Sequence, residues 1–356
     1  MTQKTGVLLI QLGTPNSPST LDVARYLGEF LNDPRVVDLP WLARKILVNG
    51  IIVPFRSPKS AKIYRHLWSI GEGTSPLLSH TRNTCSRLQE RFSQRQDSAV
   101  KVEFAMRYGE PSLPSVLEKM RLENYSRLVI IPLFPQYASA SSGSAIQRAL
   151  EIIGQWWVIP ELAVVNQFHD HPGFLDAVCA RADGFDIECF DQVIFSYHGL
   201  PERQVDKVYS EGRCSERDCE GSISLENQFC YKATCYDTSR QLAKRLGLKE
   251  SQYTTAFQSR LNGRWIEPFT DRVIEQQAKA GAKRLLIFSP AFVADCLETL
   301  IEIGVEYQAL FESLGGQEIQ LVESSNDHPR FIDCLEMLVE DRMARGESTH
   351  QATRAG

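Results

Sequence analysis

The sequence lacks three features that would place the protein in a common class. Its 39 lysine and arginine residues are outnumbered by 44 aspartate and glutamate residues, so the net charge of −5 gives no general attraction for nucleic acid. No apolar segment approaches the roughly 20 residues needed to span a bilayer. The nucleotide-binding patterns GxGxxG and GxxxxGK[ST] and the hydrolase pattern GxSxG do not occur. We therefore expect no nucleic-acid partner, no nucleotide and no serine hydrolase.

Length and composition favour a globular protein of two domains. The 356 residues, 43% hydrophobic and 23% charged, can bury one large core or two ordinary ones. The opening stretch MTQKTGVLLIQLGTP has no small-residue cleavage pattern, so we expect a first strand there and no signal peptide. We expect a cytoplasmic protein, with peripheral contact at the inner membrane as the alternative. The nine cysteines should then be thiols, cluster ligands or metal ligands before disulfides.

Three pairs of segments are similar and follow the same order in the two halves. GVLLIQLGTPNSP matches DQVIFSYHGLPER; VEFAMRYGEP, with Arg107, matches YTTAFQSRLNGRWIEP, with Arg260; and RLVIIPLFPQYASASSGSAIQ matches RLLIFSPAFVADCLETLIEIG. Each unit predicts a strand, a loop and a helix, which indicates an internal duplication and two α/β domains with mostly parallel sheets. We expect an N-terminal domain at 1–160, a C-terminal domain at 161–345 and a polar tail at 346–356.

The first half contains extra residues, because the interval from Gly13 to Arg107 is longer than the matching interval from Gly199 to Arg260. These residues are expected within about 28–75, where apolar and cationic side chains are interleaved. They are Trp41, Leu42, Ile46, Leu47, Ile51 and Ile52, with Arg44, Lys45, Arg56, Lys59, Lys62 and Arg65. This pattern suits a lip that meets anionic lipid or an apolar ligand. An amphipathic helix packed on the core is the alternative.

Candidate functional residues follow the predicted strands. Parallel sheets bind ligands outside the carboxyl ends of their strands, so the turns at 12–13, 107–108, 134–137, 198 and 295–298 should lie on one rim, facing a cleft between the domains. Tyr108, Phe134, Tyr137 and Trp265 could form walls for a flat apolar ligand, although each could equally be a core residue. Arg107 and Arg260 could pair with ligand carboxylates or with nearby acids.

A row of acids follows the last of these turns. Glu298, Glu302 and Glu306 are spaced by four residues and would stack along one helix face about 6 Å apart, with Asp295 one turn earlier. An ordinary solvated helix face is the alternative. His198 on the same rim makes a functional arrangement attractive, because imidazole and carboxylate can bind a cation such as Fe²⁺ and can accept protons near neutral pH.

Four cysteines lie in one short polar segment. Cys214 and Cys219 are separated by four residues, as are Cys230 and Cys235, and ten residues lie between the pairs. This pattern indicates a tetrathiolate site, either for a 2Fe-2S cluster or for a structural Zn²⁺. We expect Cys85, Cys179, Cys189 and Cys334 to be buried hydrophobic residues.

The sequence resembles the ferrochelatase family, which inserts Fe²⁺ into a porphyrin at the end of haem biosynthesis. The resemblance covers nearly the whole chain. It is carried by GVLLIQLGTP, EFLNDPRVVDLP, FAMRYGEPS, PLFPQYASASSGSA, FSYHGLPER, FQSRLNGRWIEP and SPAFVADCLETLIEIG. It implies the class II chelatase fold, with two Rossmann-like domains that each hold a four-stranded, mostly parallel sheet flanked by helices.

The resemblance also implies roles for single residues. His198 and Glu298 match the catalytic pair that faces across the porphyrin, Glu302 and Glu306 match the acidic path, and the segment after residue 28 matches the lip. The porphyrin-binding positions are expected at Leu12, Arg107, Tyr108, Phe134, Tyr137 and Trp265. Some bacterial members resemble this chain in holding a 2Fe-2S cluster on internal cysteines, which favours the cluster over Zn²⁺. Cys296 stands where animal members have histidine, and we expect a neutral packing residue there.

The expected reaction is Fe²⁺ insertion into protoporphyrin IX, with coproporphyrin III as the less favoured substrate, and release of two protons. A chelatase for another tetrapyrrole and metal is the alternative among enzymes. The alternative outside enzymes is a haem-carrying or iron-sensing protein whose cluster is the functional centre.

Overall fold

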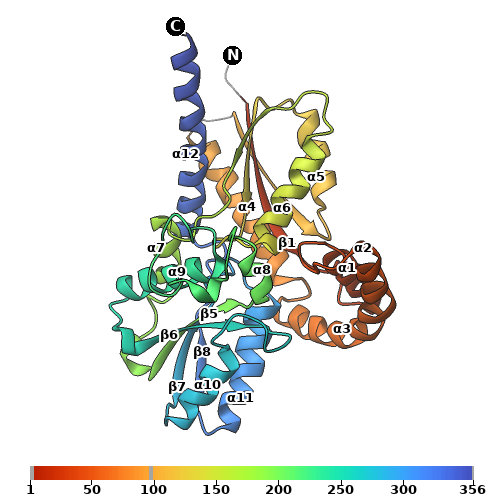
Figure 1. The fold of residues 1–356 in the computed structure, drawn as a ribbon. Helices are drawn as coiled ribbons and strands as arrows, with labels where there is room; N and C mark the ends of the chain where they lie inside the picture. Colours follow the sequence, from red (N-terminus) through yellow and green to blue (C-terminus); the bar gives the residue numbers. More distant parts are fainter. Residues whose placement is uncertain (1–3, 96–98, 355–356) are drawn as a thin grey trace. The chain divides into compact units, whose positions relative to one another are not determined.

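The computed structural model describes residues 4–95 and 99–354, with side chains described as far as Ala344. The chain forms two compact units, which are described separately (Figure 1). Unit 1 comprises Met1–Leu133, Ser139–Gln167 and Asp327–Gly356, and unit 2 comprises Phe134–Ala138 and Phe168–Asn326. These units differ from the expected domains at 1–160 and 161–345, because residues 134–138 group with unit 2 and the chain from Asp327 returns to unit 1. The side chains of the expected tail at 346–356 lie outside the described residues.

Unit 1 contains a parallel sheet in the order β2-β1-β3-β4. The strands are β1 (Thr5–Gly13), β2 (Val100–Tyr108), β3 (Arg127–Pro132) and β4 (Glu161–Val164). Its helices are α1 (Thr20–Leu31), α2 (Trp41–Lys45), η1 (Ile46–Ile52), α3 (Val53–Ile70), α4 (Pro76–Gln94), α5 (Leu113–Leu122), η2 (Ser139–Gly143), α6 (Ser144–Ile153) and α12 (Pro329–Arg354). Val7, Leu8, Leu9 and Ile10 of β1 are fully buried, as expected for a central parallel strand covered on both faces.

Unit 2 contains a second parallel sheet, in the order β6-β5-β7-β8. The strands are β5 (Gln192–His198), β6 (Tyr253–Gln258), β7 (Arg284–Phe288) and β8 (Glu318–Leu321). Its helices are α7 (Pro172–Ala180), η3 (Ile187–Cys189), α8 (Glu202–Asp206), η4 (Cys214–Glu216), α9 (Tyr231–Arg245), η5 (Glu250–Gln252), α10 (Thr270–Lys279), η6 (Glu298–Tyr307) and α11 (Gln308–Ser313).

The two sheets have the same topology, with the first strand of each unit flanked by the second and third. The loop after the second strand also folds back in the same way, since Met106 N–H donates to the Pro111 carbonyl and Phe257 N–H donates to the Pro268 carbonyl, both at 2.8 Å. The predicted α/β class, with two four-stranded parallel sheets flanked by helices, is confirmed. In the described part of the chain, no helix has both the length and the apolar character to cross a membrane.

The segment with the row of acids differs from its expected geometry. Glu298–Tyr307 forms a π-helix, η6, and not the α-helix on which the expected row was based. A π-helix closes i→i+5 hydrogen bonds, so a step of four residues falls short of a full turn. On an α-helix the same step overshoots a full turn, so in either helix successive acids are turned only slightly from one another, and the row of acids at 298, 302 and 306 stays a prediction.

Candidate active site

His198 ends strand β5 and is partly buried. Its Nδ1 lies 2.6 Å from the carbonyl oxygen of Gly199. A carbonyl can only accept a hydrogen bond, so Nδ1 carries a proton, and when the ring is neutral Nε2 keeps its lone pair. The structure thus holds the imidazole in the tautomer that can accept a proton or bind a metal through Nε2.

Aromatic rings surround this imidazole. The ring centroids of Trp265 and Phe292 lie 6.3 Å and 6.4 Å from that of His198. A Cβ at Gly199 would lie 2.8 Å from the carbonyl oxygen of Gln258 and 3.2 Å from the Trp265 ring, so only glycine lets the chain pass here. Trp265, expected to line the ligand pocket, is therefore placed beside the histidine.

Glu298 begins η6 in the same unit, beyond the end of β7. Strand β7 is the parallel neighbour of β5, so the segments bearing Glu298 and His198 follow strands that end at one edge of the sheet. Gln258, the last residue of β6, donates from Nε2 to the Glu298 main-chain oxygen at 3.0 Å and to the Glu302 carboxylate at 3.2 Å. The Glu298 side chain is partly exposed.

Glu302 is held by four hydrogen bonds. Ser259 donates from its main-chain N–H at 2.8 Å and from its hydroxyl at 2.5 Å, Tyr307 donates from its hydroxyl at 2.9 Å, and Gln258 supplies the fourth bond. A cavity of about 280 Å³ adjoins this carboxylate and is also lined by Arg260. Arg260 is paired with Asp271, so the expected alternative for this arginine, a nearby acid, is the one found.

The other two acids differ in their surroundings. Asp295 is buried, and its carboxylate accepts hydrogen bonds from Asn326, Thr299 and the Ser324 N–H. This carboxylate is fully engaged in fixing its own loop. Burial and the charge of Glu302 raise the pKa of Glu306 above its ordinary value. The Cys296 thiol is buried, and burial together with the Glu298 carboxylate raises its pKa, in keeping with a neutral packing residue.

Two of the expected ligand residues of unit 1, Arg107 and Tyr108, belong to a polar cluster around Asp33. Asp33 accepts hydrogen bonds from Arg107 at 2.5 Å, from the Tyr108 hydroxyl at 2.9 Å and from the Ser144 hydroxyl at 2.6 Å. Burial opposes ionisation of Asp33, but these bonds and the Arg35 N–H outweigh it and lower its pKa. A cavity of about 580 Å³ adjoins the cluster, lined by Arg107, Ser144 and Asp33 among others.

The exposure of the expected ligand residues separates them into two groups. Leu12 and Arg107 in unit 1 and Phe134 and Tyr137 in unit 2 are partly exposed. Tyr108 is fully buried, with its ring packed against Phe30 at 5.2 Å. Tyr108 is therefore a core residue that supports Arg107 and Asp33, which was the expected alternative.

Three of the four cysteines of the polar segment converge. The sulfur atoms of Cys214, Cys219 and Cys230 lie within 4.8 Å of one another, and all three residues are buried. Hydrogen bonds from the other two thiols lower the pKa of Cys230. Such a buried, thiol-rich group suits a soft or borderline metal. Cys235 is also buried, on α9, but lies outside this group.

A tyrosine hydroxyl adjoins the three thiols: Tyr209 Oη is 3.1 Å from the sulfur of Cys219. The guanidinium of Arg217 covers the ring of this tyrosine at 4.0 Å. Among the remaining cysteines, Cys85 and Cys334 are buried as expected. The expectation is wrong for Cys189, which is exposed, and Cys179 is only partly buried, because both lie near element ends and not on core faces.

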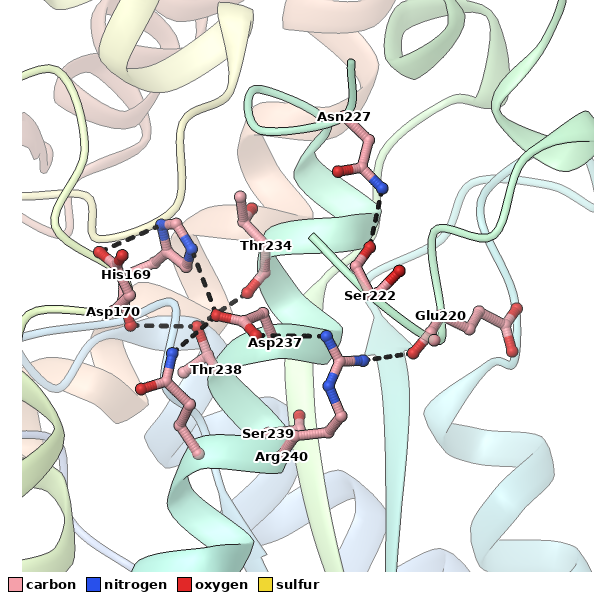
Figure 2. Close-up of polar contacts among 12 residues, drawn as sticks. His169, Asp170, Glu220, Ser222, Asn227, Thr234, Asp237, Thr238, Ser239 and Arg240 are labelled. Atoms are coloured by element: carbon pink, nitrogen blue, oxygen red, sulfur yellow. Dashed lines mark hydrogen bonds and ion pairs between the residues drawn. The ribbon is translucent and has the colours of Figure 1, made fainter. Parts of the chain in front are cut away.

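Polar contacts connect the cysteine segment to helix α9 (Figure 2). Arg240 donates to the main-chain oxygen of Glu220 and pairs with Asp237 at 3.2 Å, and Asp237 lies 3.6 Å from Nε2 of the buried His169. Thr238, the residue after Asp237, accepts a hydrogen bond from Gln136 at 3.0 Å. Helix α9 is thus attached both to the cysteine segment and to residues 134–138, and none of these polar residues was singled out from the sequence.

Comparison with known proteins agrees with this arrangement. A model of the ferrochelatase family matches residues 4–343. The chain belongs to the ferrochelatase family. A ferrochelatase of Legionella pneumophila (strain Lens) is 42% identical over 338 residues, covering 95% of this chain and 99% of the relative. A ferrochelatase of Coxiella burnetii (strain CbuK_Q154) is 40% identical over 335 residues, covering 93% and 92%.

The ferrochelatase assignment confirms the expected enzyme class, a metal chelatase of haem biosynthesis. Among solved structures, SirB from Bacillus subtilis with Fe³⁺ is similar over 97% of this chain and 98% of that chain, with a TM-score of 0.54 at 10% identity. At that identity the likeness supports the fold alone, and it agrees with the class II chelatase architecture predicted from the sequence.

Proposed function

We propose that the protein inserts Fe²⁺ into a porphyrin, with protoporphyrin IX favoured over coproporphyrin III. The observation that carries this proposal is the tautomer of His198, whose Nε2 lone pair stands at a strand end beside Trp265 and Phe292. A flat macrocycle suits aromatic walls, and a pyrrole N–H needs a base close to neutral pH. Family membership supports the same reaction.

In the proposed reaction, four nitrogen–iron bonds form while two pyrrole N–H bonds break. His198 Nε2 accepts or relays the pyrrole protons, and Glu298 positions the incoming Fe²⁺ or completes the relay; exchanged roles are the alternative. A pocket complementary to a bent macrocycle would expose the nitrogen lone pairs and so lower the barrier. Partly exposed Phe134, Tyr137 and Trp265 are proposed to contact the ring. In unit 1, Leu12 and Arg107 are also proposed to contact the ring, and Tyr108 is proposed to support Arg107.

The acidic residues are proposed to carry iron or protons along η6. Gln258 connects the first two, since it donates both to the main chain of Glu298 and to the Glu302 carboxylate. Glu306 follows, and its raised pKa suits a group that exchanges protons. Asp295 is assigned a supporting role, because its carboxylate is occupied by three hydrogen bonds within the protein.

The cysteine group is proposed to hold a 2Fe-2S cluster. Cys214, Cys219 and Cys230 fit this role because their sulfur atoms converge in a buried position, and Cys235 is the proposed fourth ligand. A 2Fe-2S cluster supplies one-electron redox chemistry and a rigid cross-link between its ligands. A structural Zn²⁺ on the same thiols is the alternative, and metal analysis with visible absorption spectroscopy distinguishes the two.

The helices α2, η1 and α3 are proposed to form a lip that touches a membrane surface. Their apolar side chains are exposed, with Phe55 76%, Trp41 66% and Leu42 61% accessible. Arg56, Lys59, Lys62 and Arg65 are exposed nearby and suit anionic lipid. Arg44 was expected among these cationic residues, but it is buried and donates to the Leu39 carbonyl at 2.7 Å. It is therefore left out of the proposed lipid contact.

The test is anaerobic Fe²⁺ insertion into protoporphyrin IX and coproporphyrin III. We expect turnover by the wild type and a loss of about 100-fold or more in kcat for His198→Ala, the size typical of a general base. His80→Ala, in unit 1, is the control and should retain activity. Full turnover by folded His198→Ala would refute the role of His198. Absence of turnover with Fe²⁺ but turnover with Co²⁺ or Ni²⁺ and another tetrapyrrole would replace the proposed substrate.

A further inference from the structure

The residues on either side of Cys230 contact two segments of the proposed active site. Before it, the Phe229 ring packs edge-on against Tyr137, with centroids 6.1 Å apart. After it, the Tyr231 hydroxyl donates a hydrogen bond of 2.9 Å to the main-chain oxygen of His198. One member of the three-thiol group is therefore a direct chain neighbour of a residue that binds the catalytic histidine.

The peptide group between His198 and Gly199 is held from both sides. Its carbonyl accepts from Tyr231, and its N–H donates to the Gln258 carbonyl at 2.7 Å. The next carbonyl along the chain, that of Gly199, is the acceptor that fixes Nδ1 of the imidazole. The Gly199 carbonyl belongs to the peptide group that directly follows the one between His198 and Gly199. The orientation of the imidazole therefore depends on how firmly the His198–Gly199 peptide group is held.

The position of Tyr231 depends in turn on Cys230, which is the N-cap of α9. The Cys230 N–H donates to the Asn227 carbonyl at 2.8 Å, and its own carbonyl accepts from Thr234 at 3.0 Å. The Cys230 sulfur lies 3.5 Å from that of Cys214. A metal bound by these thiols would therefore fix the first turn of α9, on which Tyr231 stands.

The rest of α9 is anchored independently of the thiols. Thr238 contacts Gln136 and the His169 carbonyl, and Arg245 donates to Asp176 at 3.1 Å. Asp237 lies 3.6 Å from Nε2 of His169 (Figure 2). With these attachments in place, a change at the cysteine group acts on the first turn of the helix and not on the helix as a whole. Tyr231 is buried within that turn.

We propose that Tyr231 is a positioning residue for His198 and that it transmits the metal state of the cysteine group to the active site. This inference rests on the proposed function of His198. Metal bound by Cys214, Cys219 and Cys230 holds the start of α9, and Tyr231 then holds the His198 carbonyl. Without the metal, the first turn loosens, and the imidazole loses its fixed orientation.

The test compares Tyr231→Phe with Tyr236→Phe, which removes a hydroxyl from the same helix without touching His198. Porphyrin metalation is measured for both, together with hydrogen exchange of the peptide covering 196–201. For Tyr231→Phe we expect a fall of about tenfold in kcat, the size of one lost hydrogen bond of 1–1.5 kcal/mol, and a porphyrin KM within about twofold of the wild type. Exchange at 196–201 should become faster, with the iron and zinc content of the cysteine group unchanged.

A second pair of variants tests the coupling. Cys214→Ser removes one thiol of the group without altering α9, and we expect it to accelerate exchange at 196–201 to the level of Tyr231→Phe. In the double variant Cys214→Ser/Tyr231→Phe we expect no further acceleration, because both changes act through one hydrogen bond.

Two results would overturn the proposal. One is equal kcat and equal exchange in Tyr231→Phe and Tyr236→Phe. The other is additive acceleration in the double variant, which would make Tyr231 a local structural residue. Failure of the proposed function is seen separately, since the wild type would then metalate neither porphyrin, while the exchange measurements would still report whether the cysteine group and His198 are coupled.

Discussion

Ser259 donates both its main-chain N–H and its hydroxyl to the carboxylate of Glu302. Ser259 adopts a positive φ of 63°, a left-handed conformation that is unfavourable for a residue with a side chain. It directly follows β6, so this turn aims two donors at the π-helix η6. A strained conformation kept next to a carboxylate of the proposed path is consistent with a site that holds Glu302 in place.

Substitutions at Ser259 should separate the contribution of its hydroxyl hydrogen bond from the cost of its strained backbone conformation. Ser259→Ala keeps the strained conformation and removes a hydrogen bond to a charged group, which should cost about 1.5–3 kcal/mol of stability. Ser259→Gly removes the same bond but relieves the strain, so it should cost up to about 1 kcal/mol less. Denaturant unfolding of both variants measures the difference. A larger loss for Ser259→Gly than for Ser259→Ala would show that the conformation is not strained.

Glu306 should make the stability of the protein depend on pH. Its pKa is raised in the folded protein by burial and by Glu302, so the folded state holds the proton more tightly than the unfolded state. The stability associated with this group is therefore fully present below the unfolded pKa and falls as the pH rises through the folded pKa.

Glu306→Gln should remove this dependence. At pH 7 the variant should be more stable than the wild type by on the order of 0.5 kcal/mol, the size of a like-charge pair, and the gain should shrink as the pH falls towards 4.5. Thermal unfolding across this pH range measures it, with the exposed Glu90→Gln as the charge control. A gain that is the same at every pH would contradict the assignment to Glu306.

Much of the fold was predictable because it depends on local pattern. The apolar run of β5 and its repeat in β1 indicate buried parallel strands, and the matched segments predict the shared strand order. The position of His198 at a strand end follows directly. Its tautomer does not, because it depends on the direction of the Gly199 carbonyl, which no residue pattern encodes.

The helix type and the surroundings of single residues could not be predicted, for physical reasons of the same kind. Spacing by four residues predicts an α-helix, but η6 is a π-helix, and residue spacing does not encode this hydrogen-bond pattern. Asp295 has the same side chain as a solvated acid, but it is buried and accepts hydrogen bonds from Thr299 and from the more distant Ser324 and Asn326. Likewise, no residue spacing shows that Cys235 on α9 lies outside the group of Cys214, Cys219 and Cys230, and its role as the fourth ligand stays a prediction.

Single substitutions of the cysteines should identify the fourth ligand of the proposed cluster. Cys214→Ser, Cys219→Ser and Cys230→Ser should each abolish the visible absorption and the bound iron, because each removes one of the converged thiols. Cys235→Ser should do the same, and Cys179→Ser should not. Iron, sulfide and zinc contents together with absorption spectra of the anaerobic protein measure this. Full retention of the cluster in Cys235→Ser would exclude that residue, and Tyr209→Phe would then test the hydroxyl beside Cys219.

The exposed aromatic residues of the lip should determine binding to anionic vesicles. Burying one aromatic side chain in a lipid interface contributes about 1.5–3 kcal/mol, so the double variant Trp41→Ser/Phe55→Ser should bind at least tenfold more weakly than the wild type. Trp157→Ser is the matched control, because Trp157 is an exposed aromatic residue of unit 1 that lies far along the chain from α2 and α3. Co-sedimentation with vesicles of anionic and of neutral lipid, each at low and high salt, measures the binding.

The salt dependence tests the electrostatic part of the contact. If Lys59, Lys62 and their neighbours attract anionic lipid, high salt should weaken binding to the anionic vesicles and leave binding to the neutral vesicles unchanged. Equal losses in the lip variant and the Trp157 control would show that general hydrophobicity, and not the lip, governs the contact.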